Sequence, residues 1–412
     1  MFDRDRVKFN FMKRTSILYF LNFYNDIDHT APLIASQLRE KVNVHVICNS
    51  HFKILSDIRF KCLAQSPFLH FHPLSLLPRN PGTSNEKRGP LKLWAKVGRE
   101  LLFSSIWATF FLRFYGIGCV VFTWGKPRAK GIQKRVFDAC MFNRVRTVCI
   151  PHGLNIYRNY DVNSALREKW IKTSRWPDFS DRNGFDKYIV QTSRHLDQHV
   201  FWGMDCNKLL AAGSLRFLPS WVEFNNSLID DSWLLGPTAT DNYRLVFFIP
   251  HWRYNVDYEA TISLILRLAS IPKLEIFVKG HTRGDAVSDS TIGQQKTSPL
   301  LHWNCAEESP ALIRRANIVI NFGSSVAIEA IVTGVPVIYP KYLHSNQTIF
   351  DDSGTVHMAD NEDQVVEFLN QLKRGELPGT SESAVRAFLK SEVFNNLPNE
   401  EAVIKLYRKT IG

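Results

Sequence analysis

The stretch ANIVINFGSSVAIEAIVTGVPVIYP, residues 316–340, decides the expected fold of this chain. It begins with a short apolar run, turns at Gly323, Ser324 and Ser325, continues with helical spacing, and returns after Gly334 to a second apolar run. Short Val- and Ile-rich runs on either side of a helical segment are typical of buried parallel strands joined by a crossover helix. The stretch therefore predicts a strand, a helix and a strand of a parallel α/β sheet.

The same alternation continues on both sides of this stretch. In the C-terminal half, strands are expected at 245–249, 274–278, 318–321 and 335–339, with helices at 258–269, 309–316 and 325–333. In the N-terminal half, strands are expected at 16–21, 42–48, 119–123, 147–150, 187–191 and 209–212. Each half therefore has the pattern of a Rossmann-like, doubly wound parallel-sheet domain.

The chain length agrees with two domains, because 412 residues are more than a domain with a single hydrophobic core usually contains. The first domain is expected over residues 1–224, and a linker rich in turn-forming residues over 225–242. The second domain is expected over 243–385, with C-terminal helices at 386–412 that pack back on the first. The predicted fold class is thus α/β, with two doubly wound domains facing across a cleft.

Composition excludes several classes of protein. Hydrophobic residues make up 45% and charged residues 22% of the chain, which is ordinary for a globular protein and excludes disordered and collagen-like chains. The seven cysteines are scattered without a CxxC pair, as in proteins of a reducing compartment. The N-terminus is too charged for a secretory signal, so we expect a cytoplasmic protein.

The chain is basic, with a formal net charge of +12 and basic groups within 4–14, 87–99 and 126–135. Such a surface attracts polyanions: phosphates of an activated donor, anionic lipid or nucleic acid. Residues 92–113 mix Lys, Arg, Trp and Phe as interfacial helices do, which suggests peripheral contact with an anionic inner membrane, although a core helix with a basic outer face is an alternative. No nucleic-acid-binding motif is present, so no nucleic acid is expected as a partner.

The turn at Gly323, Ser324 and Ser325 is a candidate phosphate site. Backbone N–H groups at the start of the following helix, together with two hydroxyls, suit an anion at the carboxyl edge of a sheet. Glu329, one turn into that helix, is placed to accept hydrogen bonds from ribose hydroxyls. The alternative is a helix capped by serine with no ligand.

These residues resemble a known pattern. The segment 316–340 is similar to the donor site of glycosyltransferase-B (GT-B) enzymes and of the UDP-N-acetylglucosamine 2-epimerases that share their fold. Four further motifs, VCIPHGLN at 148–155, LAAGSLRF at 210–217, FIPHWRYN at 248–255 and FVKGHTR at 277–283, resemble elements of the CDP-glycerol glycerophosphotransferases of teichoic acid synthesis and of capsular polysaccharide transferases. The resemblance covers roughly residues 145–370 and implies a GT-B-type transferase.

Two departures from that family concern the transferred group. Where that family has His-Pro, this chain has His281-Thr282. Where that family has Asp-Tyr-Ser-Ser, this chain has the run from Phe322 to Ser325. A sugar is therefore at least as reasonable a transferred group as glycerol phosphate.

Candidate catalytic residues follow the strand expected at 147–150. His152 should project from the sheet edge into the cleft, and histidine titrates near neutral pH, so it could remove the proton of an acceptor hydroxyl. Asp161 and Glu168 lie downstream and could orient His152 or act as the base themselves. A histidine that only satisfies loop carbonyls is the alternative.

Candidate donor-binding residues stand at other strand ends. Lys279, His281 and Arg283 would neutralise the donor phosphates from one sheet edge. Other candidates are expected on the opposite wall of the cleft or beside the transferred group: Arg216, His251, Arg253, Asn346 and Gln347. Each of these alone could also be an ordinary polar loop residue.

The sequence thus predicts transfer of a sugar, or a related polyol phosphate, from a CDP-, CMP- or UDP-linked donor to a hydroxyl of a bacterial surface polysaccharide or lipid-linked glycan. No cofactor is expected, and metal independence is predicted because no DxD-type pair stands at a strand end. Two alternatives stay open: a UDP-N-acetyl-sugar 2-epimerase or hydrolase on the same fold, and a non-catalytic protein that binds polyanions or membrane.

Overall fold

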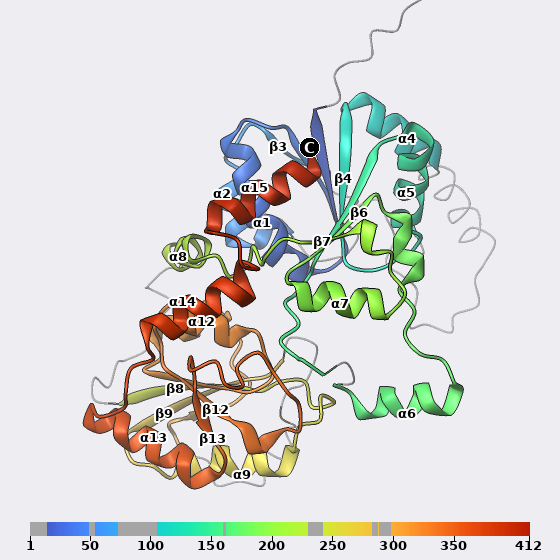
Figure 1. The fold of residues 1–412 in the computed structure, drawn as a ribbon. Coiled ribbons are helices and arrows are strands. Elements are labelled where there is room, and N and C mark those ends of the chain that lie inside the picture. The colour runs from blue at the N-terminus through green and yellow to red at the C-terminus, as the bar shows by residue number, and fades with distance from the viewer. Residues whose placement is uncertain are drawn as a thin grey trace, which may run out of the picture.

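The computed structural model describes residues 15–48, 54–72, 105–129, 131–159, 162–229, 242–281, 287 and 298–412. Within these residues the chain forms two wholly parallel sheets, one above the other in Figure 1. The first has seven strands in the order β3-β2-β1-β4-β5-β6-β7, and the second has six in the order β10-β9-β8-β11-β12-β13. The expected α/β class with two doubly wound sheets is confirmed.

The first sheet is built from short apolar strands. They are β1 Ser16–Leu21, β2 Val44–Cys48, β3 Leu69–His72, β4 Ile117–Thr123, β5 Arg146–Ile150, β6 Lys187–Val190 and β7 Leu209–Ala211. The helices between and after them are α1 Ile27–Arg39, α2 Ile58–Leu63, α4 Ser105–Phe114, α5 Ile132–Asn143, α6 Ser164–Thr173, α7 Ser193–Phe201 and α8 Pro219–Ser227. The last of these reaches three residues into the segment expected as a linker, and 230–241 lie outside the described residues.

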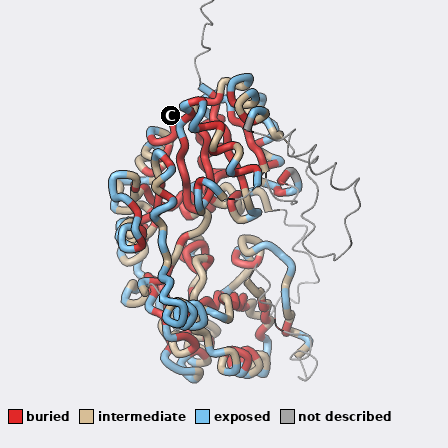
Figure 2. Tube along the Cα trace, turned by 90° about the vertical axis from the view of Figure 1, so that its right-hand side faces the viewer, coloured by how far each residue is buried: buried red, intermediate tan, exposed pale blue. Residues whose placement is uncertain are grey.

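Helices cover both faces of this sheet, which explains why residues 17–21 of β1 are all apolar. Ile17 and Tyr19 face a core shared with α1, α2 and α15, whereas Leu18 and Phe20 face a core shared with α4 and α5. All six residues of β1 are buried, and Figure 2 shows such buried segments concentrated inside the molecule. A strand buried on both faces reads as a continuous apolar run rather than an alternating one.

The second sheet follows the same plan. Its strands are β8 Tyr243–Phe248, β9 Leu274–Lys279, β10 Leu301–His302, β11 Ile318–Asn321, β12 Val337–Pro340 and β13 His357–Ala359. Its helices are α9 Tyr258–Ala269, α11 Ser309–Arg315, α12 Val326–Val332 and α13 Glu362–Arg374. Strand order reverses between β8 and β11, as it does between β1 and β4 in the first sheet. Ligands of doubly wound folds bind at the carboxyl ends of strands beside such a reversal.

The chain returns to the first domain at its C-terminal end, through α14 Glu382–Phe388 and α15 Glu400–Ile411. The Tyr407 hydroxyl donates to the carbonyl of Gly213 at 2.8 Å, and the Ser214 amide donates to the carbonyl of Val393 at 2.7 Å. Figure 1 shows α15 alongside α1. These contacts attach the C-terminal segment to the loop that follows β7.

Residues 101–122 form an apolar segment of the sequence with Arg113 near its middle. In the structure, α4 and most of β4 lie within it. Gly116, with φ of +59°, ends the helical stretch and starts the strand. None of the helices within the described parts of the chain is both long and apolar enough to cross a membrane. The basic groups at 4–14 and 87–99 fall outside the described residues.

Candidate active site

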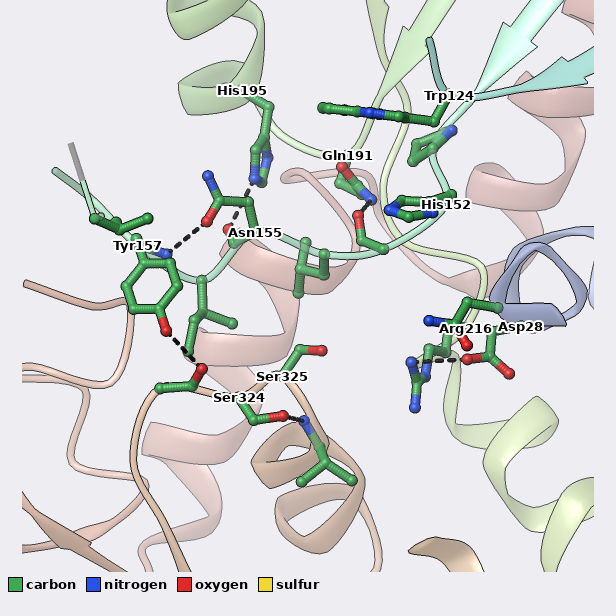
Figure 3. A pocket seen from close by; sticks show the side chains of 18 of the residues that line it. Asp28, Trp124, His152, Asn155, Tyr157, Gln191, His195, Arg216, Ser324 and Ser325 are labelled. Atoms are coloured by element: carbon green, nitrogen blue, oxygen red, sulfur yellow. Dashed lines mark hydrogen bonds and ion pairs between the residues drawn. The ribbon is translucent and has the colours of Figure 1, made fainter. Parts of the chain in front are cut away.

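A cavity of about 460 Å³ lies between the two sheets. Its walls are residues that follow the strands of both sheets, among them Trp124 after β4, His152 after β5, Gln191 after β6, Lys279 and His281 at the end of β9, and Ser324 after β11. The volume lies within the range of pockets that bind small organic ligands. The two carboxyl edges therefore enclose one candidate site (Figure 3).

The loop after β5 ties the two domains together beside this cavity. Its Ile156 carbonyl accepts from the Ile349 amide at 2.9 Å, and the Tyr157 hydroxyl donates to the Gly323 carbonyl at 2.7 Å. Gly323 has φ of +88°, and a Cβ there would stand 2.9 Å from that hydroxyl. Glycine is therefore required at this turn by both conformation and space.

His152 has a buried carboxylate beside it. Its Nδ1 lies 3.7 Å from Oδ1 of Asp26, and its ring stacks on Trp124 at 5.7 Å between centroids. The other oxygen of Asp26 accepts from the amides of Asn22 and Phe23 at 2.7 and 2.9 Å and from the Thr123 hydroxyl at 2.6 Å. The fixed carboxylate of Asp26 therefore lies on the Nδ1 side of the His152 ring.

Two other imidazoles at the cavity are engaged at both nitrogens. His195 contacts the Asn155 carbonyl and the Thr192 hydroxyl, both at 2.8 Å, and His199 contacts the His195 carbonyl at 2.7 Å and Arg182 at 3.3 Å. Burial lowers the pKa of His195 to about 3 and that of His199 to about 4, so both are neutral at pH 7. Among the described lining residues, His152 and His281 are the imidazoles left as candidates for proton transfer.

Asp28 is the only carboxylate among the described residues that line the cavity. It accepts from Arg59 at 2.6 Å and pairs with Arg216 at 2.9 Å. Burial alone would raise the pKa of Asp28, but the two guanidinium groups outweigh it and hold that pKa at about 2. Asp28 is therefore a permanent anion that orients Arg216, not a group that exchanges protons near neutral pH.

The end of β9 contributes positive charge to the opposite wall. The Lys279 ammonium donates to the carbonyls of Cys305 at 3.3 Å and Glu307 at 2.5 Å, and burial lowers its pKa. His281 lines the cavity beside it, with its ring centroid 5.7 Å from that of His251. His251 lies behind His281 and does not itself line the cavity, whereas Arg283 lies outside the described residues.

The turn after β11 brings its two serines into the cavity. The Ser324 amide donates to Oδ1 of Asn321 at 3.3 Å, and the Ser324 hydroxyl accepts from the Val326 amide at 3.4 Å. The Ser325 side chain makes no cap to α12. The turn thus presents hydroxyl groups directly opposite the loop of His152 (Figure 3).

Glu329 stands behind this turn instead of at the cavity surface. Its residue is 4% exposed, and burial raises its pKa to about 7, although Arg216 acts to lower it. Of the candidate donor-binding groups, Arg216, Lys279, His281, Gly323, Ser324 and Ser325 therefore line the cavity, and Glu329 lies in the layer behind them.

Several other predicted site residues do not line this cavity. Glu168 is exposed on α6 and Arg253 is exposed on the loop after β8, and neither lines the cavity. Asn346 is 1% exposed and structural: its amide donates to the Tyr254 carbonyl at 2.6 Å, and its oxygen accepts from two neighbouring asparagine side chains. Gln347 accepts through its carbonyl from the Arg158 amide at 2.8 Å in the same interdomain contact. Asp161 lies outside the described residues.

Sequence reasoning missed several residues of the site. Asp26 and Asp28 follow β1, Trp124 follows β4 and Gln191 follows β6, where Gln191 donates to the Gly153 carbonyl at 2.5 Å. Trp124 and Gln191 could have been found from their positions, because residues directly after buried strands gather at one sheet edge. Asp26 and Asp28 stand farther from the end of β1 and gave no such signal. No set of three or more His, Cys, Asp or Glu side chains within the described residues is placed to hold a metal ion.

Comparisons with known proteins show similarity in fold but not in sequence. No family model matches the chain, and no curated protein matches it in sequence. The UDP-GlcNAc 2-epimerase from Neisseria meningitidis, solved with UDP-GlcNAc, superposes with a TM-score of 0.58 at 13% identity, over 96% of this chain and 99% of that one. The 2-epimerase from Methanocaldococcus jannaschii gives 0.57 at 14%, over 96% and 99%.

A third solved structure, an Anabaena protein in complex with UDP-glucose, gives a TM-score of 0.53 at 11% identity, over 95% of this chain and 99% of that one. These similarities extend over nearly the whole of each chain, so they concern the arrangement of both domains. None of these three structures is a CDP-glycerol transferase, and the resemblance to that family stays a prediction. The chain has the two-domain GT-B-type fold that these nucleotide-sugar proteins share.

Proposed function

We propose that the protein is an enzyme that acts on a nucleotide-activated sugar, with His152 as the group that moves a proton. One observation carries this proposal: His152 of the first domain, with Asp26 beside it, lines the same cavity as the turn of Gly323, Ser324 and Ser325 of the second domain. Similar structures solved with UDP-GlcNAc, UDP or UDP-glucose support a nucleotide sugar as the ligand.

The second domain would hold the nucleotide. In this proposal the serine hydroxyls donate to the diphosphate, Lys279 and Arg216 balance its charge, and Glu329 accepts from the ribose after a small opening of the layer that covers it. The sugar would then extend towards His152 in the first domain. None of the seven cysteines forms a disulfide in the structure, which supports a reducing, cytoplasmic location.

Epimerisation or hydrolysis of a UDP-N-acetyl sugar is the reaction that the similar structures favour, ahead of the transfer reaction predicted from sequence motifs. Inverting a carbon next to the anomeric centre requires one group to remove a proton and another to return it to the opposite face. In this cavity His152 and His281 would be those groups, because they stand on opposite walls.

Transfer to an acceptor hydroxyl is the second candidate, and the charge of the cavity supports it. The only carboxylate among the described lining residues is Asp28, which two arginines hold ionised. A site with one oriented base suits removal of the acceptor proton, while Lys279 and Arg216 stabilise the departing nucleotide. The acceptor in this proposal is a surface polysaccharide or lipid-linked glycan.

Incubation of the purified protein with UDP-GlcNAc and no acceptor tests the two reactions against each other. Proton NMR that shows a C2-epimeric product or free N-acetyl sugar, absent with His152→Ala, would establish epimerisation or hydrolysis. An unchanged donor, consumed only after a membrane glycan extract is added, would establish transfer. Protein that consumes neither UDP- nor CDP-linked donors under any of these conditions would contradict the proposal.

A further inference from the structure

Helix α6 is ten residues long, and none of its residues is buried. A helix of this length is only marginally stable in water unless one face packs against something. One of its attachments is aromatic: the ring of Trp170 lies 6.0 Å from that of Trp176 and 6.0 Å from that of Trp202. Most of the helix surface is therefore available to a partner outside the described chain.

Apolar side chains project from α6 and from the adjoining end of α7. Exposure reaches 58% for Ile171, 57% for Trp176, 64% for Phe201 and 45% for Leu166. Phe201 packs edge-on against Trp202 at 4.8 Å, and the contact of Trp202 with Trp170 brings this end of α7 against α6. We call these four exposed side chains, with the basic residues among them, the α6 surface.

The charge on the α6 surface is positive. Residues 164–176 hold four basic side chains and one acidic side chain, a net charge of +3, and all five are exposed: Arg167, Glu168, Lys169, Lys172 and Arg175. The whole chain carries a net charge of +12, so the long-range field has the same sign as this patch. The α6 surface therefore favours an anionic partner.

The α6 surface is directly connected to the candidate active site. Val162, two residues before the helix, lines the cavity, and the Ser164 amide donates to the Asn255 side chain of the second domain at 3.2 Å. Figure 1 shows α6 at the right-hand side, apart from both sheets, and that side faces the viewer in Figure 2. A partner on α6 would thus sit close to the cavity loop.

We propose that the α6 surface docks on an anionic lipid membrane. Exposed Trp and Phe side chains insert at the level of lipid headgroups, and neighbouring Lys and Arg side chains pair with lipid phosphates. This combination matches the side chains of the α6 surface. The surface differs from residues 92–113, for which sequence alone suggested membrane contact, and it is independent of which reaction the cavity performs.

Vesicle flotation of the full chain tests this proposal. Vesicles of phosphatidylcholine with about one third phosphatidylglycerol are expected to bind the protein, whereas pure phosphatidylcholine vesicles bind it far less. The charge variant Lys169→Gln/Lys172→Gln/Arg175→Gln is expected to bind roughly 100-fold more weakly, since each lost cation near an anionic surface weakens binding severalfold. The apolar variant Trp176→Ala/Phe201→Ala is expected to lose binding at high salt as well as at low salt.

Two matched controls separate this surface from the rest of the molecule. Lys390→Gln/Lys405→Gln/Lys409→Gln removes three exposed charges from the C-terminal segment, and Phe110→Ala/Phe114→Ala removes two exposed rings from α4. Both controls are expected to float like the parent protein, and circular dichroism checks that all variants fold. Equal binding to both kinds of vesicle, no binding, or loss of binding in a control as large as in its α6 counterpart would overturn the proposal.

Discussion

Nδ1 of His152 lies 3.7 Å from Oδ1 of Asp26, across a gap that separates the loop after β5 from the turn after β1. The other oxygen of Asp26 is fixed by two amides and one hydroxyl, so the carboxylate cannot rotate freely. The fixed carboxylate therefore stands at a defined place beside the imidazole of His152. Substitutions of these two residues therefore test the proposed chemistry most directly.

Replacing His152 with Ala should lower kcat by roughly 10²- to 10⁴-fold, the usual contribution of a positioned general base. Nucleotide affinity should hardly change, because the nucleotide is proposed to bind the second domain. Steady-state kinetics with isothermal titration calorimetry measures both effects. His302→Gln, outside the cavity, is the control; equal loss in the control would contradict a specific role for His152.

Asp26→Asn keeps an oxygen for the two amides and turns an NH₂ group towards His152. We expect a lower kcat with little change in KM, because the negative charge beside Nδ1 of His152 is lost while the groups that hold the nucleotide are untouched. A merely structural role for Asp26 would lower the melting temperature and leave the kcat of the folded protein near that of the parent.

Gly323→Ala should destabilise the protein through two separate effects. Its φ of +88° strains any residue with a Cβ by about 1 to 3 kcal/mol, and that Cβ would meet the Tyr157 hydroxyl at 2.9 Å. In a Tyr157→Phe background the second effect disappears, so the same change should cost less. Urea unfolding of the four proteins measures this coupling, and strictly additive costs would contradict the contact.

Glu329 should make stability depend on pH. Burial raises its pKa from 4.5 to about 7, so the folded state holds a proton that the unfolded state has lost between those values. Stability from this group is complete below pH 4.5 and is lost as the pH rises through 7, by roughly 3 kcal/mol at most. Glu329→Gln should therefore be more stable than the parent at pH 8 and similar at pH 4.5, as measured by thermal unfolding.

The same carboxyl links pH to ligand binding. If ionised Glu329 accepts from ribose, nucleotide affinity should rise between pH 6 and 8 in the parent and stay flat in Glu329→Gln. A thermal-shift panel of CMP, CDP, UDP, GDP, TDP and ADP identifies the nucleotide, since a ligand at 100 times its Kd stabilises by about 2.7 kcal/mol. A flat panel with folded protein would favour the non-catalytic alternative.

Activity should persist in excess EDTA. Lys279 and Arg216 at the cavity are placed to neutralise a departing diphosphate, which is the task a divalent cation performs in other transferases. The measurement is turnover after chelation and dialysis. Loss of turnover that Mn²⁺ or Mg²⁺ restores would contradict this prediction.

The sequence located the central strands well and missed three at the sheet edges. Strands such as β1 and β11 are buried at every position because helices cover both faces, and the nearly continuous apolar run that results is visible without a structure. By contrast, β3, β10 and β13 are short, contain histidine and stand at sheet edges, so they carry no such run. Each of these edge strands forms by hydrogen bonding to a neighbouring strand that is already part of the sheet.

For the site, residues directly after strands could be predicted and interdomain contacts could not. His152 and Ser325 reach the cavity because the fold gathers strand ends. Asn346 has an equally suitable position in the sequence, but the docking of the two domains buries it against Asn159 of the first domain. Burial of that kind depends on the relative placement of two domains, which local patterns do not encode.

The return of the chain to its first domain has a practical consequence for dissecting the molecule. Since Tyr407 and Val393 complete the contacts of the loop after β7, a fragment that stops at residue 224 would leave the Gly213 and Ser214 backbone groups without these partners. The second domain is, in effect, inserted into the first. A circular permutant opened between the domains would therefore keep each folding unit contiguous where simple truncation cannot.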